Sequence, residues 1–173
     1  MNTDPEILAL QNLLDLQNAI GIAIDAHDGQ LDKAGKPYLW HALRVGISLL
    51  PNVDAAIVGI LHDVLEDADP AFFRGIVRAF PSKISATVCI LTRLREEPYP
   101  EYIARVGRDS LARMVKLADL RDNLDPARLA AARSAGSNME TLTRRYLDAW
   151  ETLLAMACED RVTGWELYGT YIV

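Results

Sequence analysis

The 173-residue chain is poor in cysteine, in aromatic residues and in positive charge, and each shortage narrows what the protein can be. Its two cysteines, Cys89 and Cys158, both lie in apolar segments, so we expect reduced, buried thiols rather than a disulfide framework. Aromatic residues make up only 7% of the chain, and alanine and leucine supply much of the apolar content, which favours helices over sheets. The net charge of −6 argues against a general nucleic-acid binder.

From the sequence we expect no signal for membrane targeting. The N-terminus begins acidic and lacks the basic region and long apolar core of a secretory signal. We find no apolar stretch that approaches the roughly 20 residues needed to span a bilayer. The expectation is a cytoplasmic protein with neither a membrane nor a nucleic-acid partner.

What is present is a regular helical pattern. Half of the residues are apolar, and the length suits one domain with a real core, so we expect a single domain over 1–173. Apolar residues recur with the helical period, without strand alternation, and the predicted fold class is all-α, a compact multi-helix bundle. The expected helices span about 5–27, 38–50, 53–67, 70–80, 82–94, 100–107, 109–122, 126–134 and 138–160. The tail 163–173 is β-prone and aromatic, and it could pack on the bundle or contact another subunit.

The pair His62-Asp63 is the most informative feature of the sequence. It lies in an apolar, helix-forming run, as does Asp119, and His41 lies upstream. Titratable groups are costly in such surroundings unless something pairs with them. Two imidazoles and two carboxylates would suit one divalent transition metal with positions left open for water or a substrate oxygen.

Helical spacing adds further polar groups. Residues four apart share a helix face, which would stack His62 with Glu66, Asp63 with Asp67, and Asp119 with Asn123. Carboxylates beside a metal could handle the proton of an attacking water, as metal-assisted hydrolysis requires. Simpler interpretations stay open for each part alone: His41 could be a hydrogen-bonded core histidine, and the His-Asp doublet could be an ion pair at a helix end.

Three segments together resemble the hydrolase domain of the Rel/SpoT-type alarmone enzymes and the small stand-alone alarmone hydrolases, a branch of the HD metal-dependent phosphohydrolases. They are AHDGQLDKAGKPYLWHALRVG at 26–46, LHDVLEDAD at 61–69 and VKLADLRDNLD at 115–125. They look like the family motifs AHxGQxRKxGxPYxxHPxxVA, LLHDxxEDT and KLADRLHNL. The resemblance covers about residues 20–160 and implies a helical HD-domain fold.

The resemblance also implies roles for matching positions. It implies that His41, His62, Asp63 and Asp119 hold one metal ion, usually manganese in this family. It implies that the acidic pair Glu66 and Asp67 activates the hydrolytic water. Positions near the nucleotide would be Lys33, Tyr38 and Asn123, whereas Lys116 would orient its helix or face a phosphate, and His27 would have a structural hydrogen-bonding role.

Departures from the motifs lie mainly beside the nucleotide. Asp32 stands where the family has an arginine that lies against the guanine base, so a stacking cation is replaced by an acid near the substrate. Ala42 and Ala68 replace a proline and a threonine. The third motif ends in KLADLRDN, which moves an arginine to Arg121 and adds Asp122.

The resulting hypothesis is a manganese-dependent phosphohydrolase that acts on a phosphorylated nucleotide and resembles a guanosine 3′,5′-bis(diphosphate) (ppGpp) 3′-pyrophosphohydrolase of the stringent response. One alternative keeps the metal site and changes the substrate to another nucleotide phosphate, as Asp32 would favour. Another is a non-catalytic sensor of metal and nucleotide, against which the pair Glu66 and Asp67 argues. The expected partner is the small-molecule substrate, and a homo-oligomer is compatible with this hypothesis.

Overall fold

The computed structural model describes residues 4–66 and 70–159, and within these ranges the chain forms nine packed helices. The only strand-like pairing among the described residues is an isolated antiparallel bridge between Leu31 and Pro37. The predicted all-α fold class is therefore confirmed. The helices are α1 (Pro5–Ala26), α2 (Leu39–Ile47), α3 (Val53–Leu61), α4 (Pro70–Ala79), α5 (Ser82–Leu91), α6 (Tyr99–Gly107), α7 (Ser110–Asn123), α8 (Pro126–Ser134) and α9 (Glu140–Glu159).

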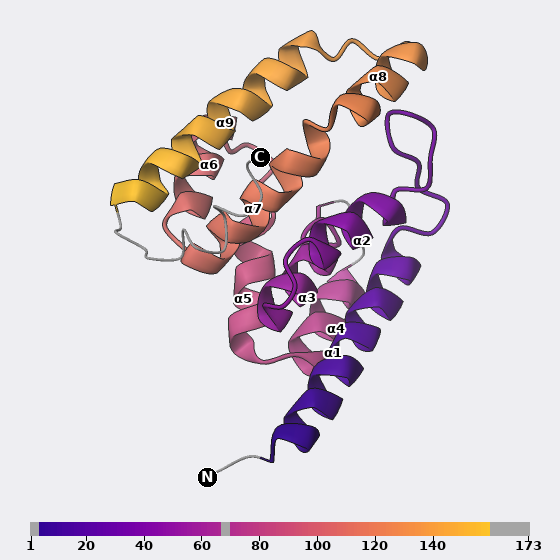
Figure 1. Ribbon diagram of the computed structural model, residues 1–173, viewed down its shortest axis with the longest axis vertical. Helices are drawn as coiled ribbons and strands as arrows, with labels where there is room; N and C mark the ends of the chain where they lie inside the picture. The colour runs from indigo at the N-terminus through magenta and orange to yellow at the C-terminus, as the bar shows by residue number, and fades with distance from the viewer. Residues whose placement is uncertain (1–3, 67–69, 160–173) are drawn as a thin grey trace.

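Helix α3 forms the centre of the molecule. Every residue from Ala55 to Leu61 is buried, and the helix packs against α1, α2, α5 and α7. Figure 1 shows α1 to α5 in the lower part of the molecule and α6, α8 and α9 in the upper part, with α7 between them. This arrangement brings the ends of α2 and α3 against the middle of α7.

Two glycines allow α2 and α3 to cross closely. A Cβ atom on Gly46 would lie 2.9 Å from the carbonyl oxygen of Ala56, and one on Gly59 would lie 3.0 Å from the Cα atom of Gly46. Contacts this short leave no room for a side chain on either helix. The close crossing places the His41 and His62 rings 5.3 Å apart, centroid to centroid.

The end of α3 corrects one expectation. The helix stops at Leu61 and does not continue through residue 67, and the chain then tightens into turns in which Val64 N–H donates to Leu61 O and Glu66 N–H donates to Asp63 O. The His62 Nδ1 atom donates to the Gly59 carbonyl oxygen at 2.8 Å and so competes for the acceptor that the next helical N–H would use. His62 and Glu66 are thus related by turns and not by a helical i,i+4 spacing.

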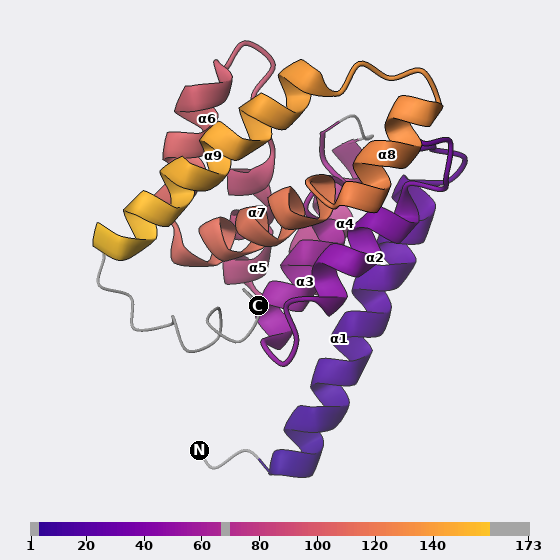
Figure 2. The same cartoon turned by 45° about the horizontal axis from the view of Figure 1, so that its top comes forward.

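The first helix begins with Asp4, whose side chain accepts a hydrogen bond from the Glu6 N–H. Ala19 and Ala23 are buried against the other helices, whereas the N-terminal half extends beyond them (Figure 2). By length and composition α1 could cross a membrane, with a mean hydropathy of 1.4, and this corrects the expectation that no such stretch exists. A core helix or a signal sequence meets the same criterion, so the finding alone assigns no membrane.

Both cysteine thiols are exposed, which corrects the expectation that they are buried. Cys89 lies on α5 and Cys158 on the last turn of α9, each on the side of its helix that faces solvent. Nearby apolar residues such as Val88 and Leu91 on α5 and Leu153 on α9 are buried on the packed side of each helix. Both remain free thiols.

Candidate metal and phosphate site

Residues from α2, from the end of α3 and from α7 meet beneath a pocket. His41 lies on α2, His62 and Asp63 follow α3, and Asp119 lies on α7. His62 Nε2 is 2.9 Å from Asp63 Oδ2, and His41 Nε2 is 3.1 Å from Asp119 Oδ1. The ligand atoms of His41, His62 and Asp63 all lie within 4.8 Å of one another, so this group could hold a metal ion.

The hydrogen bonds of the two imidazoles leave both Nε2 atoms available as metal ligands. His41 Nδ1 donates to Asp122 Oδ2 at 2.7 Å, and His62 Nδ1 donates to Gly59 O. In these tautomers each Nε2 carries a lone pair, and both Nε2 atoms are buried without a hydrogen-bond partner among the described residues. Because the lone pairs face carboxylate oxygens, the four groups repel one another unless a cation lies between them. This donor set fits a divalent metal ion.

Electrostatics at the cluster favour the charged forms of the carboxylates. Burial alone would raise the pKa of Asp119, but the charge of Lys116, whose Nζ atom is 2.7 Å from Asp119 Oδ2, holds it well below its usual range. Ionised carboxylates are the forms that bind metal.

Tyr38 and Asn123 contact the carboxylates directly. The Tyr38 hydroxyl donates to Asp63 Oδ2, and Asn123 Nδ2 donates to Asp119 Oδ1. Burial, and then the charge of Asp63, raise the pKa of Tyr38 above its usual value, so the hydroxyl remains a donor. The resemblance placed both residues near the nucleotide, and they also line the pocket, but their direct partners here are the acidic groups of the cluster.

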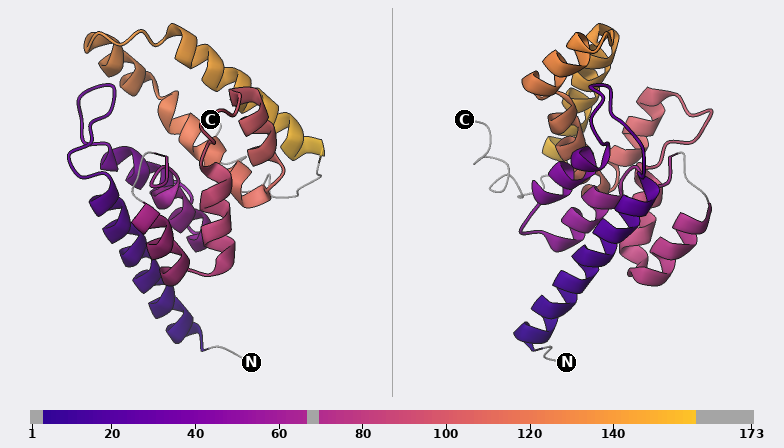
Figure 3. Two further views of the ribbon diagram at one scale, coloured as in Figure 1. Left: turned by 180° about the vertical axis from the view of Figure 1, so that it is seen from behind. Right: turned by 90° about the vertical axis from the view of Figure 1, so that its right-hand side faces the viewer.

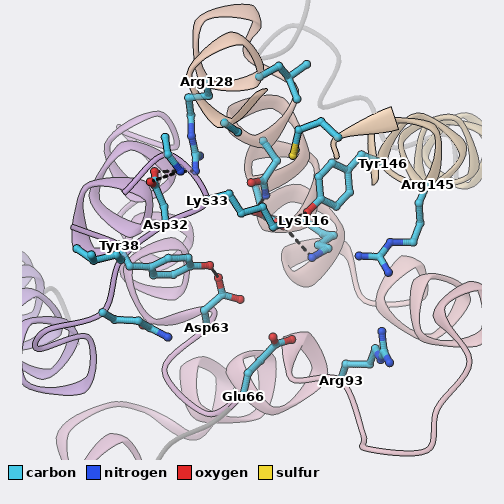
Figure 4. A pocket seen from close by; sticks show the side chains of 18 of the residues that line it. Asp32, Lys33, Tyr38, Asp63, Glu66, Arg93, Lys116, Arg128, Arg145 and Tyr146 are labelled. Carbon is cyan, nitrogen blue, oxygen red and sulfur yellow. Dashed lines mark hydrogen bonds and ion pairs between the residues drawn. The ribbon is translucent and has the colours of Figure 1, made fainter. Parts of the chain in front are cut away.

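A pocket of about 370 Å³ opens over the cluster. Asp63, Glu66 and Asp119 line its acidic floor, and cations surround them (Figure 4). The basic and aromatic groups of the wall are Lys33, Arg93, Lys116, Arg128, Arg145, Tyr99, Tyr102 and Tyr146. A pocket with ionised acids below and guanidinium and ammonium groups around it suits a phosphorylated ligand bridged by a metal.

Glu66 faces this pocket from the turn after α3. Its carboxyl is open to the pocket on one side and crowded by protein atoms on the others; this partial desolvation, and then the charge of Asp63, raise its pKa above that of free glutamate. A raised pKa matches the needs of a group that takes up a proton near neutral pH. Asp67, its predicted partner, lies outside the described residues, as does the tail 163–173.

Asp32 lines the pocket, but its carboxylate is already engaged. Oδ1 accepts hydrogen bonds from the backbone N–H groups of Ala34 and Lys36, at 2.9 and 3.0 Å, and closes the loop between α1 and α2. Oδ2 lies 3.5 Å from a guanidinium nitrogen of Arg128. The negative charge of Asp32, which the sequence predicts to lie beside the substrate, is therefore partly balanced by Arg128 from α8.

Lys33 and His27 flank the same loop. Lys33 Nζ donates to the Tyr146 hydroxyl at 3.3 Å and so connects the loop to α9 (Figure 4). His27 Nδ1 lies 2.6 Å from Gln30 Oε1, in keeping with the structural role expected for it.

The sequence alone does not assign several residues to the site. They are Asp122, Arg128, Arg93, Tyr99, Arg145 and Tyr146. Each is a charged or aromatic residue of a common kind in a helix or short connection. Arg128, Arg145 and Tyr146 come near the 28–38 loop only because α8 and α9 pack over the pocket. Figure 3 shows α8 and α9 at the same end of the molecule as the 28–38 loop.

Comparison with known proteins gives a consistent picture. No protein-family model matches the chain. It is 28% identical over 125 residues to guanosine-3′,5′-bis(diphosphate) 3′-pyrophosphohydrolase of Aquifex aeolicus, a match that covers 66% of this chain and 18% of that protein. It is 27% identical over 123 residues to the bifunctional (p)ppGpp synthase/hydrolase SpoT of Escherichia coli, covering 63% of this chain and 17% of SpoT. The chain thus spans less than a fifth of the length of these relatives.

A solved structure shares the fold. It belongs to a metazoan ortholog of SpoT that hydrolyses ppGpp, is 20% identical, and matches with a TM-score of 0.57 over 82% of this chain and 94% of that one. The likeness shows that the two chains share an all-helical fold, and in this chain the His-His-Asp group could hold a metal ion. The chain is homologous to the ppGpp hydrolase region of the SpoT/Rel enzymes.

Proposed function

We propose that the protein is a metal-dependent phosphohydrolase of a nucleotide that carries more than one phosphate group, with ppGpp or a closely similar compound as the favoured substrate. The observation that carries the proposal is the pair of buried Nε2 atoms that have no hydrogen-bond partner in the described part of the chain and face ionised carboxylates below a pocket lined with cations. Homology to ppGpp 3′-pyrophosphohydrolases supports it.

The ligands in this proposal are His41, His62 and Asp63, with Asp119 as the fourth. Manganese is the expected ion because of the family resemblance. A divalent ion held there would polarise a phosphoryl oxygen and lower the pKa of a nearby water. Tyr38 and Asn123 hold the carboxylates of Asp63 and Asp119 through hydrogen bonds, so these oxygens keep their directions when substrate enters.

Glu66 acts in the proposal as the base that accepts the proton of the attacking water. It lines the pocket, shares the turn that follows Asp63, and has a raised pKa. Asp67, next in the sequence, is proposed as its acidic partner on the strength of the resemblance alone. A pure binding module has no need of such a base, which argues against the sensor alternative.

The cations around the pocket would bind the phosphates that are not cleaved. Arg145 supports this role because its guanidinium carbon lies 4.5 Å from the centre of the Tyr99 ring while its buried Nε atom has no partner among the described residues. Lys33 and Arg93 approach from other sides (Figure 4). Cations on three sides of the pocket favour a substrate with at least two phosphate positions over a nucleoside monophosphate.

Base selectivity is expected to be low. Asp32 stands at the position where the family has the arginine that stacks on guanine. Its carboxylate accepts a hydrogen bond within its own loop and pairs with Arg128. Another nucleotide polyphosphate is therefore the second candidate substrate.

The test is a substrate panel with the purified protein, manganese, and ppGpp, GTP, ATP and NADPH. We expect hydrolysis of at least one of these nucleotides, and loss of it in Asp119→Ala. A protein that binds manganese and hydrolyses none would favour the sensor alternative.

A further inference from the structure

Asp122 lies on the far side of the His41 ring from the other acids. It follows Asp119 by three residues on α7, so both side chains project from one face of that helix. Asp119 Oδ1 is 3.1 Å from Nε2 of His41, and Asp122 Oδ2 is 2.7 Å from Nδ1. One helix thus holds both edges of a single imidazole.

The Asp122 carboxylate is itself fixed by two arginines. Arg44 Nε donates to Oδ1 at 2.6 Å and its Nη2 donates to Oδ2 at 3.1 Å, while Arg128 Nη1 also donates to Oδ2. Arg44 lies on α2, three residues after His41, and Arg128 lies on α8. The side chain of Asp122 is only 13% exposed, so its carboxylate is largely shielded from water, whereas the side chain of Arg44 is 45% exposed.

The contact between Arg128 and His41 is consistent with one proton position. Arg128 Nη1 lies 2.8 Å from His41 Nδ1, but a guanidinium nitrogen offers no lone pair to a histidine N–H. The proton of His41 is on Nδ1 because this nitrogen lies 2.7 Å from Asp122 Oδ2, an ionised carboxylate oxygen that can only accept, and Arg128 Nη1 donates to the same oxygen.

We infer that Asp122 is a positioning residue for the metal site: it keeps the proton of His41 on Nδ1 and fixes the direction of the ring, so that Nε2 remains free to bind the ion. The inference rests on the proposed metal site. The similar family motif has histidine at this position, so the resemblance does not supply this role. Partners of metal-binding histidines commonly change metal affinity about 10- to 100-fold when they are removed.

The experiment measures Mn²⁺ binding to the metal-free protein, without any nucleotide, from the EPR signal of free Mn²⁺. Asp122→Asn keeps the size of the side chain but removes its charge, and its amide can donate to Nδ1 and move the proton to Nε2. We expect Mn²⁺ affinity to fall about 10- to 100-fold. Glu97→Gln is the matched control: Glu97 is also an arginine-paired acid, with 11% of its side chain exposed, but its partner is Arg105 and not a histidine. We expect this control to bind Mn²⁺ within about twofold of wild type, because it changes no contact of the cluster.

A second variant guards against an unfolded protein. Asp122→Asn removes one of the two carboxylates that Arg128 pairs with, the other being Asp32. The double variant Asp122→Asn/Arg128→Gln lowers the excess of positive charge beside His41 and should show the same loss of affinity. Thermal unfolding of the metal-free proteins separates folding from binding. Affinity within twofold of wild type in either folded variant would overturn the role of Asp122 and leave the metal site standing. Failure of the wild type to bind Mn²⁺ would contradict the metal site and the inference together.

Discussion

Glu66 and the two histidines show how single residues acquire roles that depend on their neighbours. Burial and the charge of Asp63 raise the pKa of Glu66, and two nearby acceptors fix the proton of each imidazole on Nδ1. On an isolated helix Glu66 would lack both influences, and neither imidazole would have a fixed acceptor for Nδ1. Their chemistry therefore depends on packing around the cluster.

Replacement of Glu66 tests the division between binding and turnover. Glu66→Gln should keep the fold and Mn²⁺ binding but lose turnover by about 10²- to 10⁴-fold, because an amide cannot accept the proton of the attacking water. Steady-state kinetics at saturating manganese provide the measurement, with Glu96→Gln as a control because Glu96 is exposed and lies outside the pocket lining. Near-normal turnover in Glu66→Gln would remove this residue from the mechanism.

At the residue scale the sequence predicted the central group and not its surroundings. The motif spacing brought His41, His62 and Asp63 together correctly, because the residue types and their apolar context already required a common partner. Asp122 could not be assigned a role, since its partners Arg44 and Arg128 lie on two other helices and the sequence shows only another charge. The four-ligand set itself stays a prediction.

At the scale of elements, the close crossing of α2 and α3 sets the distance between the two histidines. Gly46→Ala should destabilise the protein by about 1–3 kcal/mol, because the added methyl group overlaps the Ala56 carbonyl and the helices must separate. It should also weaken Mn²⁺ binding. Gly21→Ala is the control, since nothing lies within 4 Å of its added Cβ atom, and it should stabilise the protein by about 0.5–1 kcal/mol. Denaturant unfolding measures the free energy of unfolding of both variants. If the two substitutions changed it equally, α2 and α3 would have room for a side chain where they cross.

The connection between α5 and α6 depends on one bidentate ion pair. Arg105 donates from Nε and Nη2 to the two carboxylate oxygens of Glu97, each at 2.7 Å, and also reaches the carbonyl oxygens of Ile90 and Thr92. This hydrogen bonding with Arg105 lowers the pKa of Glu97. The pair therefore adds stability above the pKa of Glu97 in the unfolded chain, and this stability is lost as the pH falls through the lower pKa of the folded protein.

Glu97→Gln should thus be destabilised by about 1 kcal/mol at pH 7, and the difference from wild type should disappear in acid. Urea unfolding at pH 7 and below pH 4 is the measurement. A difference that is equal at both pH values would indicate that shape, and not charge, holds this connection.

Most helices could be predicted because caps and prolines mark where they begin. Asp4, Asp109 and Asp125 each accept a hydrogen bond from the first turn of their helix, as their positions in the sequence suggest. The end of α3 could not be predicted, because the apolar run continues past it and only the hydrogen bond from His62 to Gly59 diverts the chain. The burial of the cysteines was wrong for a related reason, since an apolar sequence context does not reveal which side of a helix faces the core.

At the scale of the whole molecule, a bound ion should connect α2, α3 and α7 and so raise the free energy of unfolding. An ion that binds only the folded state adds about 2.7 kcal/mol at a concentration 100 times its Kd. For a domain of this size that corresponds to a rise in Tm of about 5–10 °C. Calorimetry with Mn²⁺ and with EDTA provides the comparison, and Asp119→Ala should show a much smaller difference. Identical Tm values for the wild type in the two conditions would argue that no ion bridges these helices.

The central claim is metal-dependent hydrolysis of a nucleotide phosphate at the His41, His62, Asp63 and Asp119 cluster, and ³¹P NMR of ppGpp during incubation tests it most directly. The account predicts that the resonances of the 3′-diphosphate disappear and free pyrophosphate appears with wild type and Mn²⁺. Neither change should occur with EDTA or with Asp119→Ala. Hydrolysis that persists in EDTA and in Asp119→Ala would contradict the account.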